Sequence, residues 1–406
     1  MDLWERVRTV AEGAGAAGVG VCTAEPFTEV RLELETRRRT GAHAGLGFTY
    51  SHPEVATDIR SSFPWAERIV VVAWSYLPEA GSPGPPDPGT GRIARFATED
   101  HYRGLRQVLD AVVAELELDG QRAVALADDD RMVDRAAAVR AGVGWWGKNS
   151  MVLAPGHGPW LLLGSVVTDA GLTPTAPMAR GCGSCSACLP ACPTGALVAP
   201  GVLDARRCLA RWAQAPGIIP LEFRAPMGDR LYGCDDCLDA CPPGFRALAA
   251  ADEPRGRVDI LALLAASDAE LVSEYAHFYL PKRNARILRR NALVVLGNTS
   301  GEEAVPVLAG YLGHPDPVLR LHAAWALGVV GGRRAQAALA ASAPDEPDPE
   351  VLAQIARAQI GGAQIGRAQA APGPTPGAEP SFHVERRRRS PASGPDDQGG
   401  VDPPIL

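Results

Sequence analysis

The pattern of apolar positions divides the first 175 residues into alternating strand-like and helix-like stretches. A short continuous apolar run is typical of a buried strand, whereas apolar residues at intervals of three and four indicate an amphipathic helix. The strand pattern occurs at 68–76, 123–127 and 160–167, and the helix pattern occurs at 2–18, 25–40, 100–118 and 132–141. Strands that alternate with helices are consistent with an α/β or α+β domain, and we expect an α+β domain over 1–175.

Beyond Asp252 the pattern changes to helices only. Two phrases, Arg290–Asn298 and Leu321–Gly328, are each a short amphipathic helix that ends on glycine, and their starts lie about 31 residues apart. This period predicts HEAT-like helical repeats. From Ala371 the chain is rich in Pro, Gly, Ser and charge, which predicts a disordered tail. Its arginines, Arg386 to Arg389, could touch RNA or lipid, but a solvated tail is the simpler interpretation.

Eight of the nine cysteines fall into two groups. The first group is Cys182, Cys185, Cys188 and Cys192, and the second is Cys208, Cys234, Cys237 and Cys241. The first has the spacing C-x2-C-x2-C-x3-C-P, which is the bacterial ferredoxin signature for a [4Fe-4S] cluster. Eight thiolates supply two four-cysteine clusters, so the chain is predicted to carry electrons.

The ligand sets follow from a crossing rule: the fourth cysteine of each ferredoxin motif serves the neighbouring cluster. We expect the first cluster on Cys182, Cys185, Cys188 and Cys241, and the second on Cys192, Cys208, Cys234 and Cys237. Cys208 lies 26 residues ahead of Cys234, so an inserted segment separates two ligands of one cluster. The alternatives are a zinc ribbon, which usually has two separated C-x2-C pairs, and a disulfide framework, which is expected behind a secretory leader. Cys22 stands alone in an apolar run and is interpreted as a buried hydrophobe.

Charge and hydropathy limit the partners and the cellular compartment expected for this chain. The net charge of −7 and the pI of about 5.7 give no overall indication of nucleic acid, so any such contact must come from a local patch. No stretch approaches the ~18 apolar residues of a membrane-spanning helix, and the first residues lack the apolar core of a signal peptide. We therefore expect a cytoplasmic protein with no membrane partner. Only two lysines occur, Lys148 and Lys282.

Several motifs together resemble the epoxyqueuosine reductase family, over about residues 1–335. They are Gly144-Trp-Trp-Gly-Lys-Asn149, Leu163-Gly-Ser-Val-Val-Thr168 and Tyr232-Gly-Cys-Asp-Asp-Cys237, together with the two cysteine groups and the helical repeats. The resemblance implies a cobalamin-dependent enzyme that reduces epoxyqueuosine to queuosine at the wobble position of tRNA. It also implies a nitroreductase-like domain that holds base-off cobalamin, a ferredoxin-like module with two [4Fe-4S] clusters, and HEAT-like repeats that receive the tRNA. The expected boundaries are 1–175, 176–250, 251–370 and a tail at 371–406.

The reaction needs a proton donor as well as electrons. Converting an epoxide to an alkene consumes two electrons and two protons, and no side chain supplies electrons, so a cofactor must carry that step. We hypothesise that a carboxylic acid protonates the departing oxygen. The family usually reads Asp-x-x-Pro-x-x-Glu-Arg here, which makes Asp128 the first candidate and Asp134 the second. Arg131 replaces the proline, and Asp134 could instead be an ordinary acidic residue at a helix N-terminus.

By the same resemblance, a set of residues is expected to contact cobalamin: Tyr102, Asp128, Lys148, Asn149, Val152, Leu163 and Gly164. Lys148 could instead be a surface cation. Two departures from the family lie nearby. The usual Asp-Tyr-His is present as Asp100-His101-Tyr102, and the usual Ile-Ser-Tyr after the fifth cysteine is present as Leu209-Ala-Arg211. Both leave open an altered substrate.

A basic strip with no acid between Tyr279 and Ser300 is the candidate tRNA contact. Its members are Lys282, Arg283, Arg286, Arg289 and Arg290. On a helix, Arg283, Arg286 and Arg290 would share one face, which suits contacts to phosphates. The alternative is an ordinary solvated helix face.

Three functions from different classes remain open. The favoured one is the tRNA epoxide reductase, acting as a monomer with a low-potential electron donor such as flavodoxin or ferredoxin. The second is a corrinoid iron–sulfur reductase with a small-molecule substrate, such as a dehalogenase-like enzyme. The third is a non-catalytic electron-transfer protein with a helical docking arm, for which the large N-terminal domain would have no evident purpose.

Overall fold

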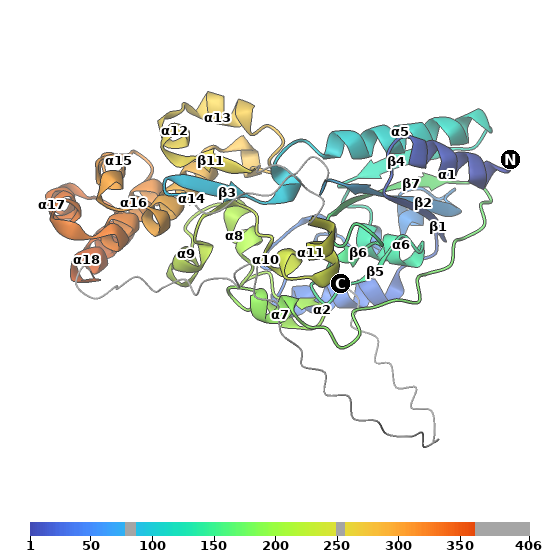
Figure 1. Ribbon diagram of the computed structural model, residues 1–406, viewed down its shortest axis with the longest axis horizontal. Coiled ribbons are helices and arrows are strands. Elements are labelled where there is room, and N and C mark those ends of the chain that lie inside the picture. The colour runs from blue at the N-terminus through green and yellow to red at the C-terminus, as the bar shows by residue number, and fades with distance from the viewer. Residues whose placement is uncertain (78–86, 249–255, 362–406) are drawn as a thin grey trace, which may run out of the picture.

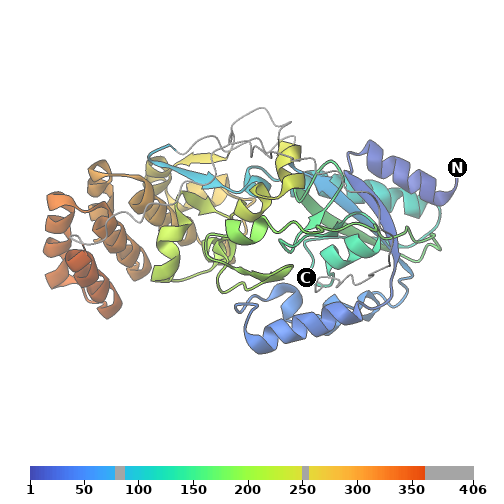
Figure 2. The same cartoon turned by 60° about the horizontal axis from the view of Figure 1, so that its bottom comes forward.

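The computed structural model describes residues 1–77, 87–248 and 256–361. Three parts follow one another along the longest axis: a sheet domain, the cysteine-bearing segment and a set of packed helices (Figure 1). The turned view keeps the same order, with the cysteine-bearing segment between the other two parts (Figure 2). Among the described residues, no helix is both long and apolar enough to cross a bilayer. The predicted tail at 371–406 lies outside the described residues.

The sheet domain is built on four strands in the order β1-β2-β7-β4, and every neighbouring pair is antiparallel. The strands are β1 (Gly18–Thr23), β2 (Arg68–Ser75), β4 (Ala123–Ala127) and β7 (Leu161–Thr168). The three strands predicted from apolar runs are confirmed. An antiparallel sheet with helices on its faces is an α+β arrangement, as the sequence predicts.

Both faces of this sheet are covered by helices, because side chains alternate along each strand. Val70 and Val72 of β2 pack with α1 and α5, whereas Ile69, Val71 and Ala73 pack with α2, α3 and α6. The helices are α1 (Leu3–Gly13), α5 (Tyr102–Leu118), α2 (Thr28–Thr40), α3 (Pro53–Ala56) and α6 (Asp134–Arg140). The sheet therefore has two separate apolar cores, and Cys22 lies buried in one of them, as predicted.

The helix predicted over 2–18 is too long. It starts behind Asp2, whose carboxylate accepts the backbone N–H of Glu5 in a capping box, and ends at Gly13. The edge strand β1 begins at Gly18, five residues later, and was missed because its glycines break the strand pattern. Gly20 is required there by close packing, since a Cβ would lie 2.0 Å from the carbonyl oxygen of Ala141.

A second, three-stranded sheet links parts of the chain that are distant in sequence. Its order is β10-β3-β11, with β10 parallel and β11 antiparallel to the central strand. The strands are β3 (Thr90–Ile93), β10 (Arg230–Tyr232) and β11 (Arg257–Asp259). The expectation of helices only beyond Asp252 is therefore wrong. These strands are three or four residues long and partly polar, and they depend on partners far away in sequence, so no local pattern marks them.

The cysteine-bearing segment consists of short elements joined by tight turns. Its helices are α7 (Cys188–Ala191), α8 (Leu209–Gln214), α9 (Leu221–Met227), α10 (Asp236–Asp239) and α11 (Pro242–Leu248). Two small hairpin-like pairs flank it: β5 (Trp145–Trp146) with β6 (Val152–Leu153), and β8 (Leu197–Ala199) with β9 (Val202–Leu203). Such short elements cannot bury an extensive core of their own, so the segment depends on its neighbours and on bound groups.

The far end is a stack of helices in which α16 packs between α14 and α18. The helices are α12 (Ile260–Ala265), α13 (Asp268–Glu274), α14 (Arg286–Thr299), α15 (Val305–Tyr311), α16 (Pro317–Val330), α17 (Gly332–Ser342) and α18 (Pro349–Gly361). The repeated glycine has a packing reason. A Cβ at Gly297 would lie 2.8 Å from the Cβ of Ala326, and one at Gly328 would lie 2.7 Å from the Cβ of Ala358. Glycine thus lets successive repeats approach closely.

Substituting Gly20 of β1 tests its close packing against the carbonyl of Ala141. Gly20→Ala should lower the free energy of unfolding by about 1–3 kcal/mol, because the new methyl overlaps a backbone carbonyl that cannot rotate away. Gly13→Ala is the matched control: nothing lies within 4 Å of that Cβ, and alanine favours the helix by up to about 1 kcal/mol. Thermal unfolding checks both variants, and equal melting temperatures would contradict the packing argument.

Candidate cluster sites and active site

The first set of cysteines surrounds one cavity. Cys182, Cys185, Cys188 and Cys241 line one small pocket together with Lys148, Asn149 and Pro242. These are the four thiols that the crossing rule assigns to the first cluster. Cys241 reaches the set from the end of α10, so the chain returns to cysteines that it left more than 50 residues earlier. In the part of the chain described, no three His, Cys, Asp or Glu side chains converge tightly enough for a single metal ion.

Lys148 is tied to this first set. Its backbone N–H donates to the sulfur of Cys182 at 3.4 Å, and its ammonium donates to the carbonyl oxygen of Gly183 at 2.7 Å. The neighbouring Asn149 is 3% exposed, and its amide nitrogen has no hydrogen-bond partner. The Lys148–Asn149 pair therefore lies between the first cluster site and the sheet domain.

The second set consists of Cys192, Cys208, Cys234 and Cys237. Burial raises the pKa of Cys237, and the nearby charges of the other three thiols raise it further. A backbone N–H already points at one of the sulfurs: Ala196 donates to Cys192 at 3.1 Å. Hydrogen bonds of this kind stabilise the thiolate that a cluster requires.

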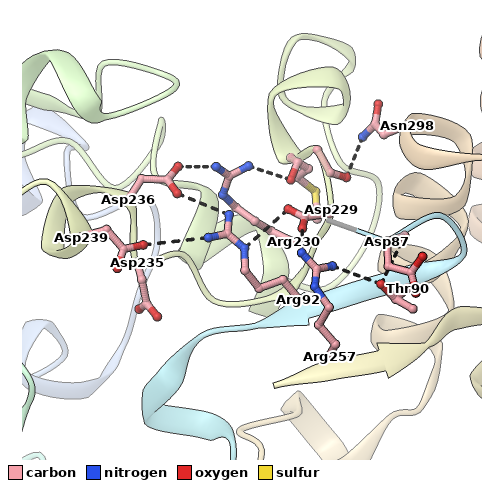
Figure 3. A network of polar contacts seen from close by, with 12 residues as sticks. Asp87, Thr90, Arg92, Asp229, Arg230, Asp235, Asp236, Asp239, Arg257 and Asn298 are labelled. Carbon is pink, nitrogen blue, oxygen red and sulfur yellow. Dashed lines mark hydrogen bonds and ion pairs between the residues drawn. The ribbon is translucent and has the colours of Figure 1, made fainter. Parts of the chain in front are cut away.

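Acidic side chains lie between the ligands of the second set, and arginines neutralise them (Figure 3). Arg92 of β3 lies 3.5 Å from Asp229, 3.4 Å from Asp236 and 3.9 Å from Asp239. Arg230 also pairs with Asp236. Each buried carboxylate thus has a cationic partner, as burial of charge requires.

One more arginine, Arg95, connects this network to the sheet domain. It is 5% exposed, donates to Asp239 at 2.6 Å, and lies over the ring of Trp160 with its guanidinium carbon 4.7 Å from the centroid. Its backbone N–H donates to Asp235 at 2.8 Å. Strand β3 and the turn after it therefore hold the loop that carries Cys234 and Cys237.

The two candidate proton donors lie in one acidic group with Tyr102. Burial raises the pKa of Tyr102, and the charges of Asp128 and Asp134 raise it further, so the three side chains lie within electrostatic range of one another. Asp128 directly follows β4 and has a left-handed backbone, with φ of 53°. Asp134 begins α6. Sequence positions 102, 128 and 134 thus converge at one edge of the antiparallel sheet.

The two carboxyl groups differ in environment. Burial raises the pKa of Asp134 to about 8, in spite of a hydrogen bond from the Ser165 hydroxyl at 3.3 Å, and the charge of Asp128 adds to the shift. Burial and the charge of Asp129 also raise the pKa of Asp128, which is the more exposed of the two. Asp134 is also the acidic residue in the first turn of α6, as its alternative role at a helix N-terminus requires, and it is half-buried there.

The departures from the family pattern have structural explanations. Arg131, in the usual proline place, forms a bidentate pair with Asp129 at 2.6–2.8 Å and lies over the ring of Phe63. His101 is buried against Tyr76, with ring centroids 5.7 Å apart, which leaves Tyr102 facing the acidic group. Arg211 donates to the Ala44 carbonyl at 3.0 Å.

Two of the predicted cofactor positions are packing residues. Gly164 faces α5, where a Cβ would lie 2.7 Å from Leu109, whereas Leu163 and Ser165 lie on the opposite face of β7. The position of Gly164 therefore does not support its predicted role as a cofactor contact. Val152 is 3% exposed and belongs to the core beneath α6.

The predicted basic helix face is wrong. Helix α14 begins at Arg286, so Arg283 is not part of it, and Lys282 and Arg283 form a turn with φ of 56° and 51°. Arg289 is 8% exposed and donates to Asp268 and to the carbonyls of Leu264 and Ala266.

Arg290 is also a structural residue, at 1% exposed. Its guanidinium donates to the carbonyls of Trp212 and Gly217 at 2.9 and 2.8 Å. The guanidinium of Arg283 donates to the carbonyls of Val272 and Ala276. Lys282 and Arg283 are the exposed members of the strip, whereas Arg286 is half-buried and pairs with Asp316 at 3.2 Å.

Sequence reasoning did not single out three residues of this region. Ser165 bonds Asp134, Arg135 lies beside it, and Tyr232 lies within electrostatic range of Asp128. Arg135 and Tyr232 stand inside the quoted motifs and could have been chosen on that ground. Ser165 also stands inside a quoted motif, Leu163–Thr168, but it is a single hydroxyl in an apolar strand, so only the motif marks it.

Family comparisons agree with the two modules at the C-terminal side. Residues 181–244 match a family described as a 4Fe-4S double cluster binding domain, and residues 280–359 match HEAT repeats. The first match covers all eight grouped cysteines and favours clusters over a zinc ribbon or disulfides. The second covers α14 to α18.

Comparisons over the whole chain find proteins that are similar over most of its length. The epoxyqueuosine reductase of Bacillus cereus is 31% identical over 370 residues, which are 88% of this chain and 96% of that protein, and the Bacillus subtilis enzyme is 31% identical over 345 residues. A crystal structure of selenomethionine-labelled epoxyqueuosine reductase matches with a TM-score of 0.81 and 30% identity, covering 89% of this chain and all of that one. A second, solved with an epoxyqueuosine-modified tRNA-Tyr stem loop, matches with 29% identity and the same TM-score and coverage. On identity, coverage and fold together, this chain belongs to the epoxyqueuosine reductase family.

Proposed function

We propose that this protein reduces epoxyqueuosine to queuosine in tRNA. The observation that carries the proposal is its similarity to epoxyqueuosine reductases over 88% of the chain, with both cysteine sets present. A relative solved with a modified tRNA stem loop supports RNA as the substrate class. A tRNA substrate and oxygen-sensitive clusters suit the cytoplasm, and the protein would act there as a monomer. Electrons would come from a low-potential carrier such as flavodoxin or ferredoxin.

The residues between the first cluster site and the sheet fit a cobalamin. Corrin side chains are amides, and the buried amide nitrogen of Asn149 lacks a partner in the structure. We infer that Asn149, Leu163 and Tyr102 hold the ring in a nitroreductase-like domain, with Lys148 holding the cluster loop beside it. Bound cobalamin would supply a metal centre able to pass two electrons to the epoxide.

Asp128 is the proposed proton donor. It lies in a loop, and a solved Bacillus subtilis relative is described as having an aspartate catalytic loop swung out of the active site. A left-handed backbone at a non-glycine residue is uncommon and is often associated with functional loops. Asp134 would act as the second acid, keeping a proton close by while the Ser165 hydroxyl fixes its carboxyl group. Two acids match the two protons that the reduction consumes.

The proposed tRNA contact is limited to the exposed pair Lys282 and Arg283 and the backbone near them. Both side chains lie at the start of the helical repeats, and cationic groups there would position phosphates without reading sequence. Arg289 and Arg290 are excluded, because their donors are used inside the protein.

Turnover tests the proposal directly. Cluster-reconstituted protein, cobalamin and a low-potential reductant should remove one oxygen atom from an epoxyqueuosine-containing stem loop under anaerobic conditions, as read by mass spectrometry of nucleosides. Asp128→Asn should lower the rate by about 10²–10⁴-fold while both clusters are retained, since a positioned general acid contributes about that much. The exposed neighbour variant Asp130→Asn is the control and should stay near the parent rate.

Two outcomes would contradict this assignment. Protein that holds both clusters and cobalamin but leaves the stem loop unchanged would point to a corrinoid reductase with a small-molecule substrate. Equal losses in the variants at 128 and 130 would remove Asp128 as the donor.

The proton on Asp134 can be tested by pH dependence and by infrared spectroscopy. Because its pKa is raised to about 8 while an unfolded aspartate titrates near 4, the folded state holds a proton that the unfolded state has released. Its contribution to stability therefore falls as pH rises from about 4 to about 8. At pH 7 the infrared spectrum should contain a protonated carboxyl band that Asp134→Asn removes.

Asp129→Asn is the matched control for that band. The pKa of Asp129 is lowered by its hydrogen bonds from Arg131, so this carboxyl is ionised at pH 7 and contributes no such band. A band that survives in Asp134→Asn would show that another acid carries the proton.

Removing Lys282 tests the RNA contact. Lys282→Ala should weaken stem-loop binding and reduce the slope of log K against log salt by about one, because one phosphate contact releases about one counterion. Arg333→Ala removes an exposed cation from α17 at the far end of the repeats and should leave the slope unchanged. Fluorescence anisotropy at several salt concentrations measures both, and identical slopes in parent and Lys282→Ala would rule out this contact.

A further inference from the structure

The inserted segment between Cys208 and Cys234 contacts Ala44 and strand β3 on one side and is attached to the helical repeats on the other. Hydrogen bonds to it come from three repeat helices. The donors and acceptors are Arg290, Asn291 and Asn298 of α14, His322 of α16 and Gln354 of α18. The two ends of this segment are ligands of the second cluster, so whatever fixes the segment also fixes the distance between those ligands.

Arg290 binds one end of α8. Its guanidinium donates to the carbonyls of Trp212, Ala215 and Gly217, which lie at and just beyond the C-terminal end of that helix. Carbonyls there have no partners within the helix and carry its negative dipole end, so a buried cation is well placed to satisfy them. Burial and the charges of Arg286 and Arg211 lower the pKa of Arg290 to about 9. No acidic side chain is among the groups that shift this pKa. Arg290 therefore remains charged at neutral pH.

The other end of α8 is the cluster ligand itself. Cys208 is the residue directly before the helix, so the position of α8 sets the position of its sulfur. One short helix thus has a cation at its C-terminal end and a thiolate ligand at its N-terminal end. Moving the C-terminal end would therefore also move the ligand at the N-terminal end.

Asn291 extends the same contact to the second ligand. Its amide nitrogen donates to the carbonyl of Ala213 in α8 at 2.7 Å and to that of Leu231 in β10 at 2.8 Å. Its amide oxygen accepts from Arg290 at 2.7 Å. Leu231 lies three residues before Cys234, so one buried amide bridges the chain segments that carry the two ligands.

We propose that Arg290 and Asn291 are positioning residues for the second cluster, through which the helical repeats set its geometry and reduction potential. Reduction adds one negative charge to a cluster, and hydrogen bonds to its sulfurs and nearby positive charge favour that state. Loss of Arg290 removes a buried positive charge and frees α8, and both changes lower the potential. The proposal concerns the cluster alone, so it stands or falls independently of the tRNA substrate.

The test is a redox titration followed by electron paramagnetic resonance, with one cluster observed at a time. Cys241→Ser removes a ligand of the first cluster and Cys237→Ser a ligand of the second. In the Cys241→Ser background, Arg290→Gln should shift the remaining midpoint to lower potential. In the Cys237→Ser background, the same substitution should leave the midpoint unchanged. Arg290→Lys keeps the charge without the guanidinium fork and should give a smaller shift.

Arg289→Gln is the matched control. Arg289 is the adjacent buried arginine of the same helix, but its partners are Asp268, Tyr311 and carbonyls next to α12, none of which belongs to the inserted segment. It should not move the second midpoint. If Arg290→Gln fails to fold, Asn291→Ser, which retains a small polar group, is measured in its place. Equal shifts in the variants at 289 and 290, equal shifts of both clusters, or no shift would each overturn the proposal.

Discussion

Each cluster needs four thiolates, and this chain supplies them by returning to a set of cysteines that it has already passed. Cys241 closes the set that begins at Cys182, so the residues between them form a loop that starts and ends at the first site and contains all four cysteines of the second set. The short helices of that loop have too little apolar surface to fix its course. The neighbouring parts provide the missing contacts: β3 pairs with β10 on one side, and α14 binds α8 on the other. The cysteine spacing thus accounts for the order of the three parts along the molecule.

Electrostatics imposes a second condition on the same loop. Asp235, Asp236 and Asp239 alternate with cluster ligands, and a buried carboxylate beside an anionic cluster is unfavourable without a cation. Arg92 and Arg95 meet this need from a strand and turn that precede the cysteines by about 90 residues. Strand β3 is therefore better understood as part of the cluster environment than as an edge of the sheet domain.

Sequence patterns predicted the elements and sites whose signal is local. Cysteine spacing, the strand at 68–76 and the repeat glycines each depend on neighbours in the chain, and each was found at its predicted position. Asp134 was chosen on a motif, but its environment could not be read from sequence, because burial and Ser165 come from a distant strand. Strands β3 and β11 were missed for the same reason.

The basic strip shows why charge runs are hard to interpret. A guanidinium group has the same sequence signature whether it faces phosphate or a buried row of carbonyls. Its planar fork with five donors serves both purposes, and the difference between the exposed Arg283 and the buried Arg290 lies in what packs around them.

The buried arginines fall into two electrostatic classes. Arg95 faces carboxylates, so its charge is cancelled locally whether or not a cluster is bound. The hydrogen-bond acceptors of Arg290 are carbonyl and amide oxygens, so it leaves a net positive charge in the protein interior. Such a charge is costly to bury in the absence of an anion. The buried charge of Arg290 is less costly beside a loop that carries a negatively charged cluster. Cluster binding and the docking of the repeats therefore stabilise each other. The helical repeats and the iron–sulfur loop are therefore one cooperative unit, although they belong to separate families in sequence.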